Sequence, residues 1–268
     1  MKSICCALAA TALLLAAALC LATTVAAEEA ATAAAQPAAK PAEPAAKPAA
    51  DKGYQPLTSE QKWDRRVQQF EKMDKETPPP AGAVLFTGSS TIAIWEKLQE
   101  DFKPLATIAR GLGGCTVADM TRYADRIVIP YKPRTIVFYA GDNDLVKKSG
   151  EQVFEDYKAF VEKVRKALPE ARILFISIKP SPSRAKYWDE AKKANQSIKE
   201  FCEKTPGLGY IDTVPTLMDA DGKPNPELFM KDQLHMNRAG YLLWIPILKA
   251  AIEKDAAAPP AAPATEKK

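Results

Sequence analysis

Hydrophobic residues are distributed along the middle of the chain in two different patterns. Short, continuous apolar runs, typical of buried strands, are separated by longer stretches with apolar residues at helical spacing. We expect strands at residues 83–86, 106–109, 135–140, 172–178 and 208–212, with helices at 117–128, 151–169, 185–204 and 238–254. Apolar strands joined by crossover helices favour a buried parallel sheet. The pattern therefore predicts an α/β fold, a three-layer α/β/α sandwich.

A further helix is expected before the first strand. Four apolar residues recur there at spacings of four, three and three, on one helical face: Trp63, Val67, Phe70 and Met73. Thr58, with Gln61 three residues later, forms a capping-box pattern for its start, and the prolines at 78–80 end it. We interpret this segment as a helix that packs on the core of one domain, residues 53–254.

The first 27 residues differ from the domain in composition. Lys2 is followed by a long apolar run that ends in Val25-Ala26-Ala27, a pattern typical of a cleaved signal peptide. We expect export to the periplasm or cell envelope, with no stable membrane insertion after cleavage; secretion and a retained anchor stay open. A lipid anchor on Cys20 is less favoured because Leu19, not a small residue, precedes it.

Two other segments also lie outside the predicted domain. Residues 28–52 and 255–268 consist mostly of Ala, Pro, Lys and Glu, with no large apolar side chains to bury. Such composition predicts a disordered linker and a disordered tail.

Charge and cysteine content limit the partners of the protein. A formal net charge of +4 is too small for the electrostatic footprint of nucleic-acid binding, so we expect no nucleic-acid partner. Only Cys115 and Cys202 lie beyond the predicted leader, and whether they pair stays open.

Three candidate segments follow successive predicted strands. In a parallel sheet, ligands bind beyond the carboxyl ends of the strands. Gly88-Ser89-Ser90 follows the first strand, a glycine-rich turn ending in Gly114 follows the second, and Gly141-Asp142-Asn143-Asp144 follows the third. Each segment taken alone also fits an ordinary turn or helix cap, and the two aspartates also fit a cation site.

A fourth segment contains the only histidine in the chain, His235. Asp232 precedes it by three residues, a spacing that can bring both side chains to the same side. A carboxylate can then hold the imidazole tautomer while the other ring nitrogen accepts a proton. A single histidine also excludes histidine-rich metal sites. By itself, the segment also fits a surface histidine beside an acid.

Together, these segments resemble the four sequence blocks of the SGNH (GDSL-like) hydrolases. The blocks appear here as FTGSST, ARGLGG, YAGDND and DQLH. The resemblance implies a flavodoxin-like five-stranded parallel sheet of order 2-1-3-4-5 and an esterase with a covalent acyl-enzyme. It implies that Ser90 is the nucleophile, that Asp232 and His235 complete the triad, and that Ser90, Gly114 and Asn143 form the oxyanion hole.

The chain departs from the family pattern at two positions. Ser89 stands where an aspartate often precedes the nucleophile, as in GSS-type members, and Cys115 directly follows the oxyanion glycine. Neither change removes a triad residue.

The resulting expectation is an exported serine esterase that needs no metal or organic cofactor. It would hydrolyse carboxylic esters, short acyl or acetyl esters in particular, on a small molecule or a glycan. A catalytically silent glycan-binding module of the cell envelope is the alternative, and an envelope spacer whose terminal arms matter most is a third reading. The natural substrate, with lysophospholipids and thioesters among the candidates, and the oligomeric state stay open.

Overall fold

The computed structural model describes residues 56–257. The predicted signal peptide, the predicted linker and residues 258–268 of the predicted tail lie outside the described residues. Among the residues that are described, no helix is both long and apolar enough to cross a membrane.

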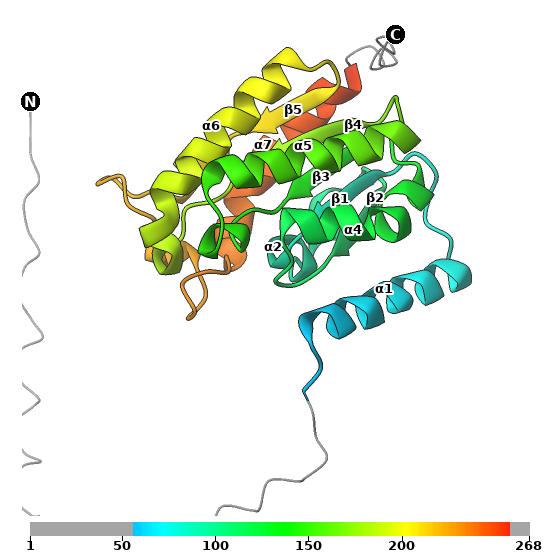
Figure 1. Cartoon of the computed structure of the whole chain (residues 1–268), viewed down its shortest axis with the longest axis horizontal. Helices are drawn as coiled ribbons and strands as arrows, with labels where there is room; N and C mark the ends of the chain where they lie inside the picture. Colours follow the sequence, from blue (N-terminus) through cyan, green and yellow to red (C-terminus); the bar gives the residue numbers. More distant parts are fainter. Residues whose placement is uncertain (1–55, 258–268) are drawn as a thin grey trace, which may run out of the picture. The chain divides into compact units, whose positions relative to one another are not determined.

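The centre of the fold is a five-stranded, all-parallel sheet (Figure 1). Its strands are β1 (Val84–Gly88), β2 (Thr107–Gly111), β3 (Thr135–Tyr139), β4 (Arg172–Ile176) and β5 (Leu208–Ile211). They lie in the order β2-β1-β3-β4-β5, each hydrogen-bonded in parallel to its neighbours. This arrangement confirms the predicted fold class and strand order.

Helices cover both faces of the sheet (Figure 1). The longer helices are α1 (Ser59–Glu76), α4 (Val117–Ile127), α5 (Gly150–Ala167), α6 (Trp188–Lys204) and α7 (Arg238–Ala257). The short elements are α2 (Ser90–Ala93), α3 (Leu98–Asp101), η1 (Ile129–Tyr131), η2 (Asp144–Val146), η3 (Pro182–Tyr187), η4 (Val214–Leu217) and η5 (Pro226–Leu228).

The two faces of the sheet carry separate apolar cores. Because successive strand residues point to opposite faces, Leu85 packs with α1, α4, α5 and α6, whereas Phe86 packs with α2, α3 and α7. Both side chains are fully buried. The two cores hold the sheet between helical layers and leave only the strand ends and their loops to form a site.

The helix before the first strand forms as predicted. Thr58 and Gln61 make the reciprocal bonds of a capping box. Phe70 is buried against the core, but Met73 on the same predicted face is 54% exposed. Near that end of α1 the helix is held instead by Asp74, which pairs with Arg110 of β2 and accepts a 2.6 Å hydrogen bond from the hydroxyl of Tyr131.

The last helix extends past the predicted end of the domain at residue 254. It continues to Ala257 because Asp255 is only 6% exposed and is bonded to the core. The Asp255 carboxylate accepts a 2.9 Å hydrogen bond from Thr135 and pairs with Arg172. The first residues of the predicted tail are therefore part of the fold.

Two buried acids hold the loop after β3. Asp142 accepts a 2.7 Å hydrogen bond from Lys179, whose side chain is fully buried, and a 3.2 Å bond from the hydroxyl of Tyr139. Burial opposes ionisation, but the Lys179 ammonium holds the pKa of Asp142 below its usual value. Asp142 is thus one half of an internal ion pair, which argues against the cation-site reading of this loop.

Asp144 fastens the same loop to the start of α4. Its carboxyl oxygens lie 3.1 and 3.2 Å from the backbone nitrogen of Val117, which donates to them. The residue is 1% exposed. Burial raises the pKa of Asp144 to about 7, and the Val117 N–H opposes that shift only in part. At neutral pH, the protein therefore holds a carboxyl group that is close to its titration point.

This raised pKa predicts the pH dependence of stability. Between about pH 4 and pH 7 the folded state binds the Asp144 proton and the unfolded state does not, so the free energy of unfolding falls as pH rises through this window. Asp144→Asn keeps an oxygen acceptor for Val117 but has no charge to bury. As pH rises from 5 to 8, the free energy of unfolding should decrease less in the variant than in the wild type, by about 1–3 kcal/mol.

Urea unfolding of both proteins at the two pH values measures this difference. Asp125→Asn serves as a control because that side chain is 67% exposed. An equal pH dependence in the wild type and Asp144→Asn would show that Asp144 does not titrate in this range.

Candidate active site

The first three candidate segments begin at the same edge of the sheet, where β1, β2 and β3 end in register. Gly88, the last residue of β1, lies opposite Gly111 of β2 on one side and opposite Tyr139 of β3 on the other. Its φ of 139° favours glycine, and a Cβ there would lie 1.8 Å from the Tyr139 carbonyl oxygen. Only glycine therefore lets β1 pass this close to β3 just before Ser90.

The structure brings Ser90, His235 and Asp232 into one hydrogen-bonded chain. The Nε2 atom of His235 lies 2.9 Å from the Oγ of Ser90. Its Nδ1 atom lies 2.5 Å from Oδ2 of Asp232. Ser90 begins α2 directly after the turn that follows β1. The three residues predicted as a triad thus have the contacts of nucleophile, base and base-orienting acid.

The Asp232 carboxylate also shapes the turn that carries it. Its Oδ1 accepts hydrogen bonds of 3.0 Å from the backbone nitrogens of Leu234 and His235. Gln233, between Asp232 and Leu234, has a φ of 54°, in the left-handed region. The backbone of Met230 closes the turn, with its nitrogen donating a 2.7 Å bond to the His235 carbonyl. The same acid therefore fixes both the ring and the backbone of His235.

Helix α7 fixes the distance between the histidine segment and the serine segment. Asn237 caps α7, since its side-chain oxygen accepts a 3.2 Å hydrogen bond from the backbone nitrogen of Gly240. One turn further on, the hydroxyl of Tyr241 donates a 2.8 Å bond to the carbonyl oxygen of Thr91 in α2. Tyr241 is buried, so this link between the two segments is shielded from water.

The candidate oxyanion donors come from three loops. Gly114 has a φ of 75°, which glycine adopts at no steric cost. Asn143 donates a 3.0 Å hydrogen bond from its side-chain nitrogen to the carbonyl oxygen of Cys115, next to Gly114. An amide nitrogen carries two protons, so one remains for a ligand. The backbone N–H of Ser90 has no acceptor within α2 because it lies in the first turn.

Electrostatics separate the roles of the ionisable groups in the site. Partial desolvation raises the pKa of Asp232, but hydrogen bonds from the His235 ring and from two backbone N–H groups lower it to about 2. Asp232 therefore stays ionised and can stabilise a protonated imidazole. By contrast, burial raises the pKa of the Cys115 thiol well above its usual range, with Asp119 and Asp144 adding to the effect.

Both cysteines that lie beyond the predicted leader are buried free thiols. Within the described part of the chain, no group of three or more His, Cys, Asp or Glu side chains is arranged to hold a metal ion. The side chains of Ser90, His235, Asp232 and Asn143 provide hydroxyl, imidazole, carboxylate and amide groups in the candidate site.

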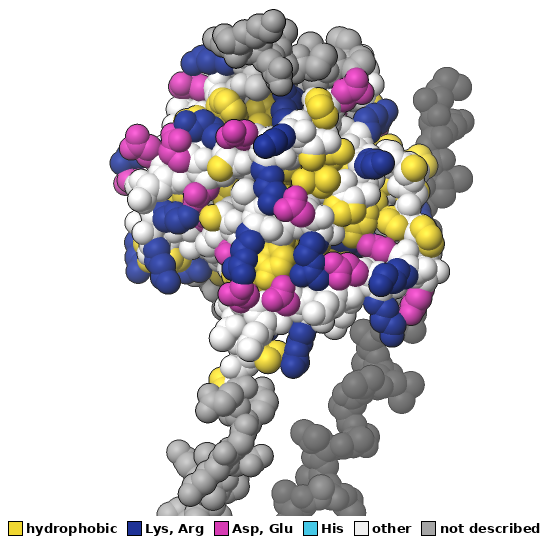
Figure 2. All heavy atoms as spheres, turned by 45° about the vertical axis from the view of Figure 1, so that its right-hand side comes forward, with side chains coloured by type: hydrophobic (Ala, Val, Ile, Leu, Met, Phe, Trp, Pro, Cys, Tyr) yellow, Lys and Arg dark blue, Asp and Glu magenta, His cyan; other side chains and the backbone are white. Residues whose placement is uncertain are grey.

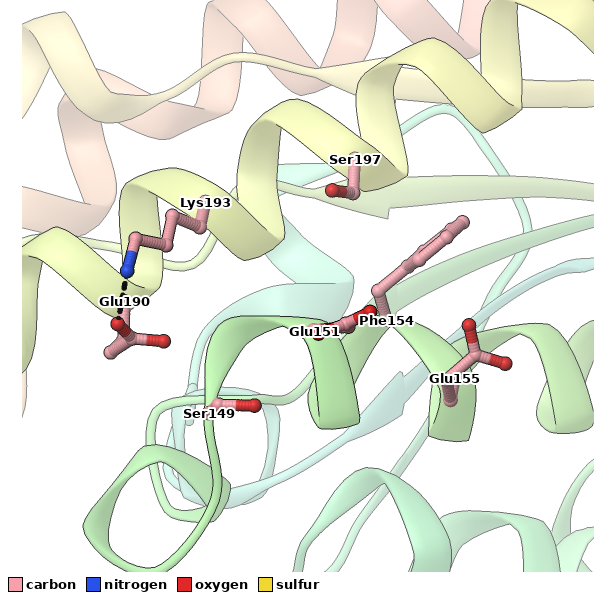
Figure 3. A pocket seen from close by; sticks show the side chains of 7 residues that line it. All are labelled: Ser149, Glu151, Phe154, Glu155, Glu190, Lys193 and Ser197. Carbon is pink, nitrogen blue, oxygen red and sulfur yellow. Dashed lines mark hydrogen bonds and ion pairs between the residues drawn. The ribbon is translucent and has the colours of Figure 1, made fainter.

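The candidate triad lies in an open part of the surface. The His235 side chain is 25% exposed and that of Asp232 is 49% exposed. A hollow of about 480 Å³ lies elsewhere, between α5 and α6; Figure 3 shows the ion-paired Glu190 and Lys193 at one end of it, with Phe154 among its other lining residues. None of the triad residues lines that hollow.

Charges of both signs are mixed on the surface. In the face shown in Figure 2, Lys and Arg side chains lie among Asp and Glu, and no large area carries only positive charge. The mixture of charges on this face agrees with the small net charge of the chain.

Several residues that support the site were not predicted from the sequence. Lys179, Tyr241 and Trp63 each bond to the segments that carry the candidate groups, from positions far away in the chain. Lys179 follows β4, so its position after the carboxyl end of a strand was the one sequence signal that it lies near the site. Tyr241 and Trp63 lie on helices, where their spacing indicates burial but not a partner.

Sequence comparison places the chain in a family of lipases and acylhydrolases. Residues 81–243 match the GDSL-like Lipase/Acylhydrolase family. The chain is 26% identical, over 195 residues, to the platelet-activating factor acetylhydrolase IB subunit alpha1 of Rattus norvegicus, covering 70% of this chain and 81% of the relative. The human subunit of that name is 25% identical over 195 residues, with the same coverage.

Solved structures share the fold at lower sequence identity. A GDSL-like lipase from Bacteroides thetaiotaomicron matches with a TM-score of 0.60 at 21% identity, covering 70% of this chain and 97% of the other. An acetylxylan esterase from Geobacillus stearothermophilus matches with a TM-score of 0.51 at 15% identity, covering 66% of this chain and 95% of the other. The family match spans more than half of the sequence, and we conclude that the chain belongs to the GDSL-like lipase/acylhydrolase family of hydrolases.

Proposed function

We propose that this protein is a serine esterase that hydrolyses short acyl esters through a covalent Ser90 intermediate. The observation that carries the proposal is the unbroken chain of contacts from Ser90 Oγ through the His235 ring to Asp232. The predicted leader adds that the reaction takes place outside the cytoplasm. Membership of an acylhydrolase family supports the reaction class.

In the first half of the reaction, a serine hydroxyl must lose its proton to become an effective nucleophile. His235 Nε2 accepts that proton as Ser90 Oγ attacks the ester carbonyl, and the ionised Asp232 stabilises the imidazolium. The tetrahedral intermediate then expels the alcohol, which takes the proton from His235. The acyl group is left on Ser90 Oγ.

In the second half, water replaces the alcohol. His235 accepts a proton from the water as the water oxygen attacks the acyl carbonyl, and it returns that proton to Ser90 Oγ when the acid leaves. The oxyanion of each tetrahedral intermediate would accept hydrogen bonds from Ser90 N–H, Gly114 N–H and the free proton of the Asn143 amide. Losing one such donor typically lowers kcat by about 100- to 1000-fold.

Two observations favour a short acyl group. The triad lies at an open surface, and the hollow of about 480 Å³ between α5 and α6 is not lined by any triad residue. The relatives with the matching sequence are named as acetylhydrolases. A small acyl group on a larger alcohol, such as a glycan, fits an open site better than a long acyl chain that needs a groove.

The first prediction from the proposed function is that Ser90 alone carries the covalent label. A fluorophosphonate should modify Ser90, and Ser90→Ala should lose on the order of 10⁶-fold in kcat on p-nitrophenyl acetate. Ser89→Ala is the matched control, because Ser89 is fully buried beside the nucleophile and should be dispensable. Peptide mapping of the adduct and steady-state kinetics measure both effects.

A label on Ser89, or full turnover by Ser90→Ala, would overturn the assignment. If folded wild-type protein is neither labelled nor active on any ester, the glycan-binding alternative is favoured instead. Binding of envelope glycans, measured with the same preparation, then tests that alternative.

The second prediction concerns acyl chain length. If a groove buried the acyl chain, each added methylene would gain about 0.8 kcal/mol, or about fourfold in kcat/KM. We expect no such rise across p-nitrophenyl esters from acetyl to octanoyl, with the acetyl ester the best substrate. A steady increase with chain length would contradict the short-acyl proposal while leaving the serine mechanism intact.

A further inference from the structure

The helix before the first strand reaches the candidate oxyanion loop through one side chain. The indole N–H of Trp63 in α1 donates a 2.8 Å hydrogen bond to the carbonyl oxygen of Gly113. The ring packs edge-on against Tyr123 of α4, with centroids 6.4 Å apart and planes at 80°. Because α1 ends at Glu76, it lies wholly outside the family match, which begins at residue 81.

The carbonyl that Trp63 binds belongs to the same peptide group as the Gly114 N–H. This peptide bond is trans, so its C=O and N–H point in opposite directions within one plane. Fixing the Gly113 oxygen toward α1 therefore fixes the Gly114 N–H on the opposite side. A hydrogen bond to the oxygen also polarises the peptide and makes its N–H a stronger donor.

A 3.3 Å hydrogen bond from the Cys115 nitrogen to the Leu112 carbonyl oxygen closes this turn, but it does not use the C=O or N–H of the central Gly113–Gly114 peptide. Gly113 and Gly114 are exposed, and a Cβ at either position would meet no heavy atom within 4 Å. Two successive glycines also have the widest choice of backbone conformations. An oxyanion donor is most effective when its direction is fixed before the reaction, since no energy is then spent on turning it.

The rest of α1 is anchored without the indole N–H. Val67 and Phe70 are buried in the core beneath α1. Glu71 makes a two-bond ion pair with Arg126 of α4, at 2.7 and 2.9 Å. Loss of the Trp63 hydrogen bond should therefore leave the helix in place, so its effect on the loop can be measured separately.

From these contacts we infer that Trp63 is a positioning residue, which orients and polarises the Gly113–Gly114 peptide for catalysis. The inference rests on the proposed esterase function and deepens it. It makes α1 part of the catalytic unit rather than a packing element that precedes it.

The test compares Trp63→Phe with Arg126→Ala. Trp63→Phe keeps an aromatic ring beside Tyr123 but has no N–H to donate. We expect kcat to fall about 10-fold, less than for full removal of a donor, with KM within about twofold. Fluorophosphonate labelling of Ser90 should slow by the same factor. Arg126→Ala should lower Tm through loss of the Glu71 ion pair and leave kcat unchanged.

A second replacement removes only the hydrogen bond. Benzothienylalanine at position 63 exchanges the ring N–H for sulfur with nearly the same shape, and it should reproduce the loss in kcat even if Trp63→Phe folds poorly. Wild-type kcat and labelling rate in this protein would overturn the inference. An equal kcat loss in Arg126→Ala would also overturn it, because the effect would then follow helix attachment. Either result leaves Ser90 labelled, whereas failure of the proposed function leaves it unlabelled.

Discussion

The register of β1 between β2 and β3 determines where the candidate catalytic groups lie. Parallel pairing ends the three strands at the same level, so the chain leaves β1 between the points where it leaves β2 and β3. Gly88 permits the close approach of β1 to β3 because a residue with a Cβ atom would collide with the Tyr139 carbonyl oxygen. Backbone pairing of the strands, rather than contact between side chains, therefore brings Ser90, Gly114 and Asn143 to the same edge of the sheet.

The remaining candidate catalytic groups depend on a different constraint. His235 and Asp232 lie far along the chain from Ser90, and no strand carries them. Their position follows from α7, which packs on the second core and bonds through Tyr241 to the carbonyl of Thr91. The ionised Asp232 then completes the arrangement, because one carboxylate holds both the imidazole ring and the turn beneath it.

Much of this architecture could be predicted because it is local or periodic. Strand runs, helical spacing and the cap at Thr58 each depend on neighbouring residues, and the lone histidine left no choice of base. The pairs Asp142–Lys179 and Trp63–Gly113 could not be predicted, because they join residues 37 and 50 positions apart. Such contacts depend on how the layers pack, which a single sequence does not specify.

A crystal structure of the protein after reaction with a small fluorophosphonate tests the account most directly, because the phosphonyl oxygen imitates the oxyanion of the tetrahedral intermediate. We predict a phosphorus–oxygen bond to Ser90 Oγ. The phosphonyl oxygen should lie within about 2.7–3.1 Å of the Ser90 nitrogen, the Gly114 nitrogen and the Asn143 side-chain nitrogen. An oxygen that points to solvent, or a Gly114 N–H turned away from it, would contradict the account.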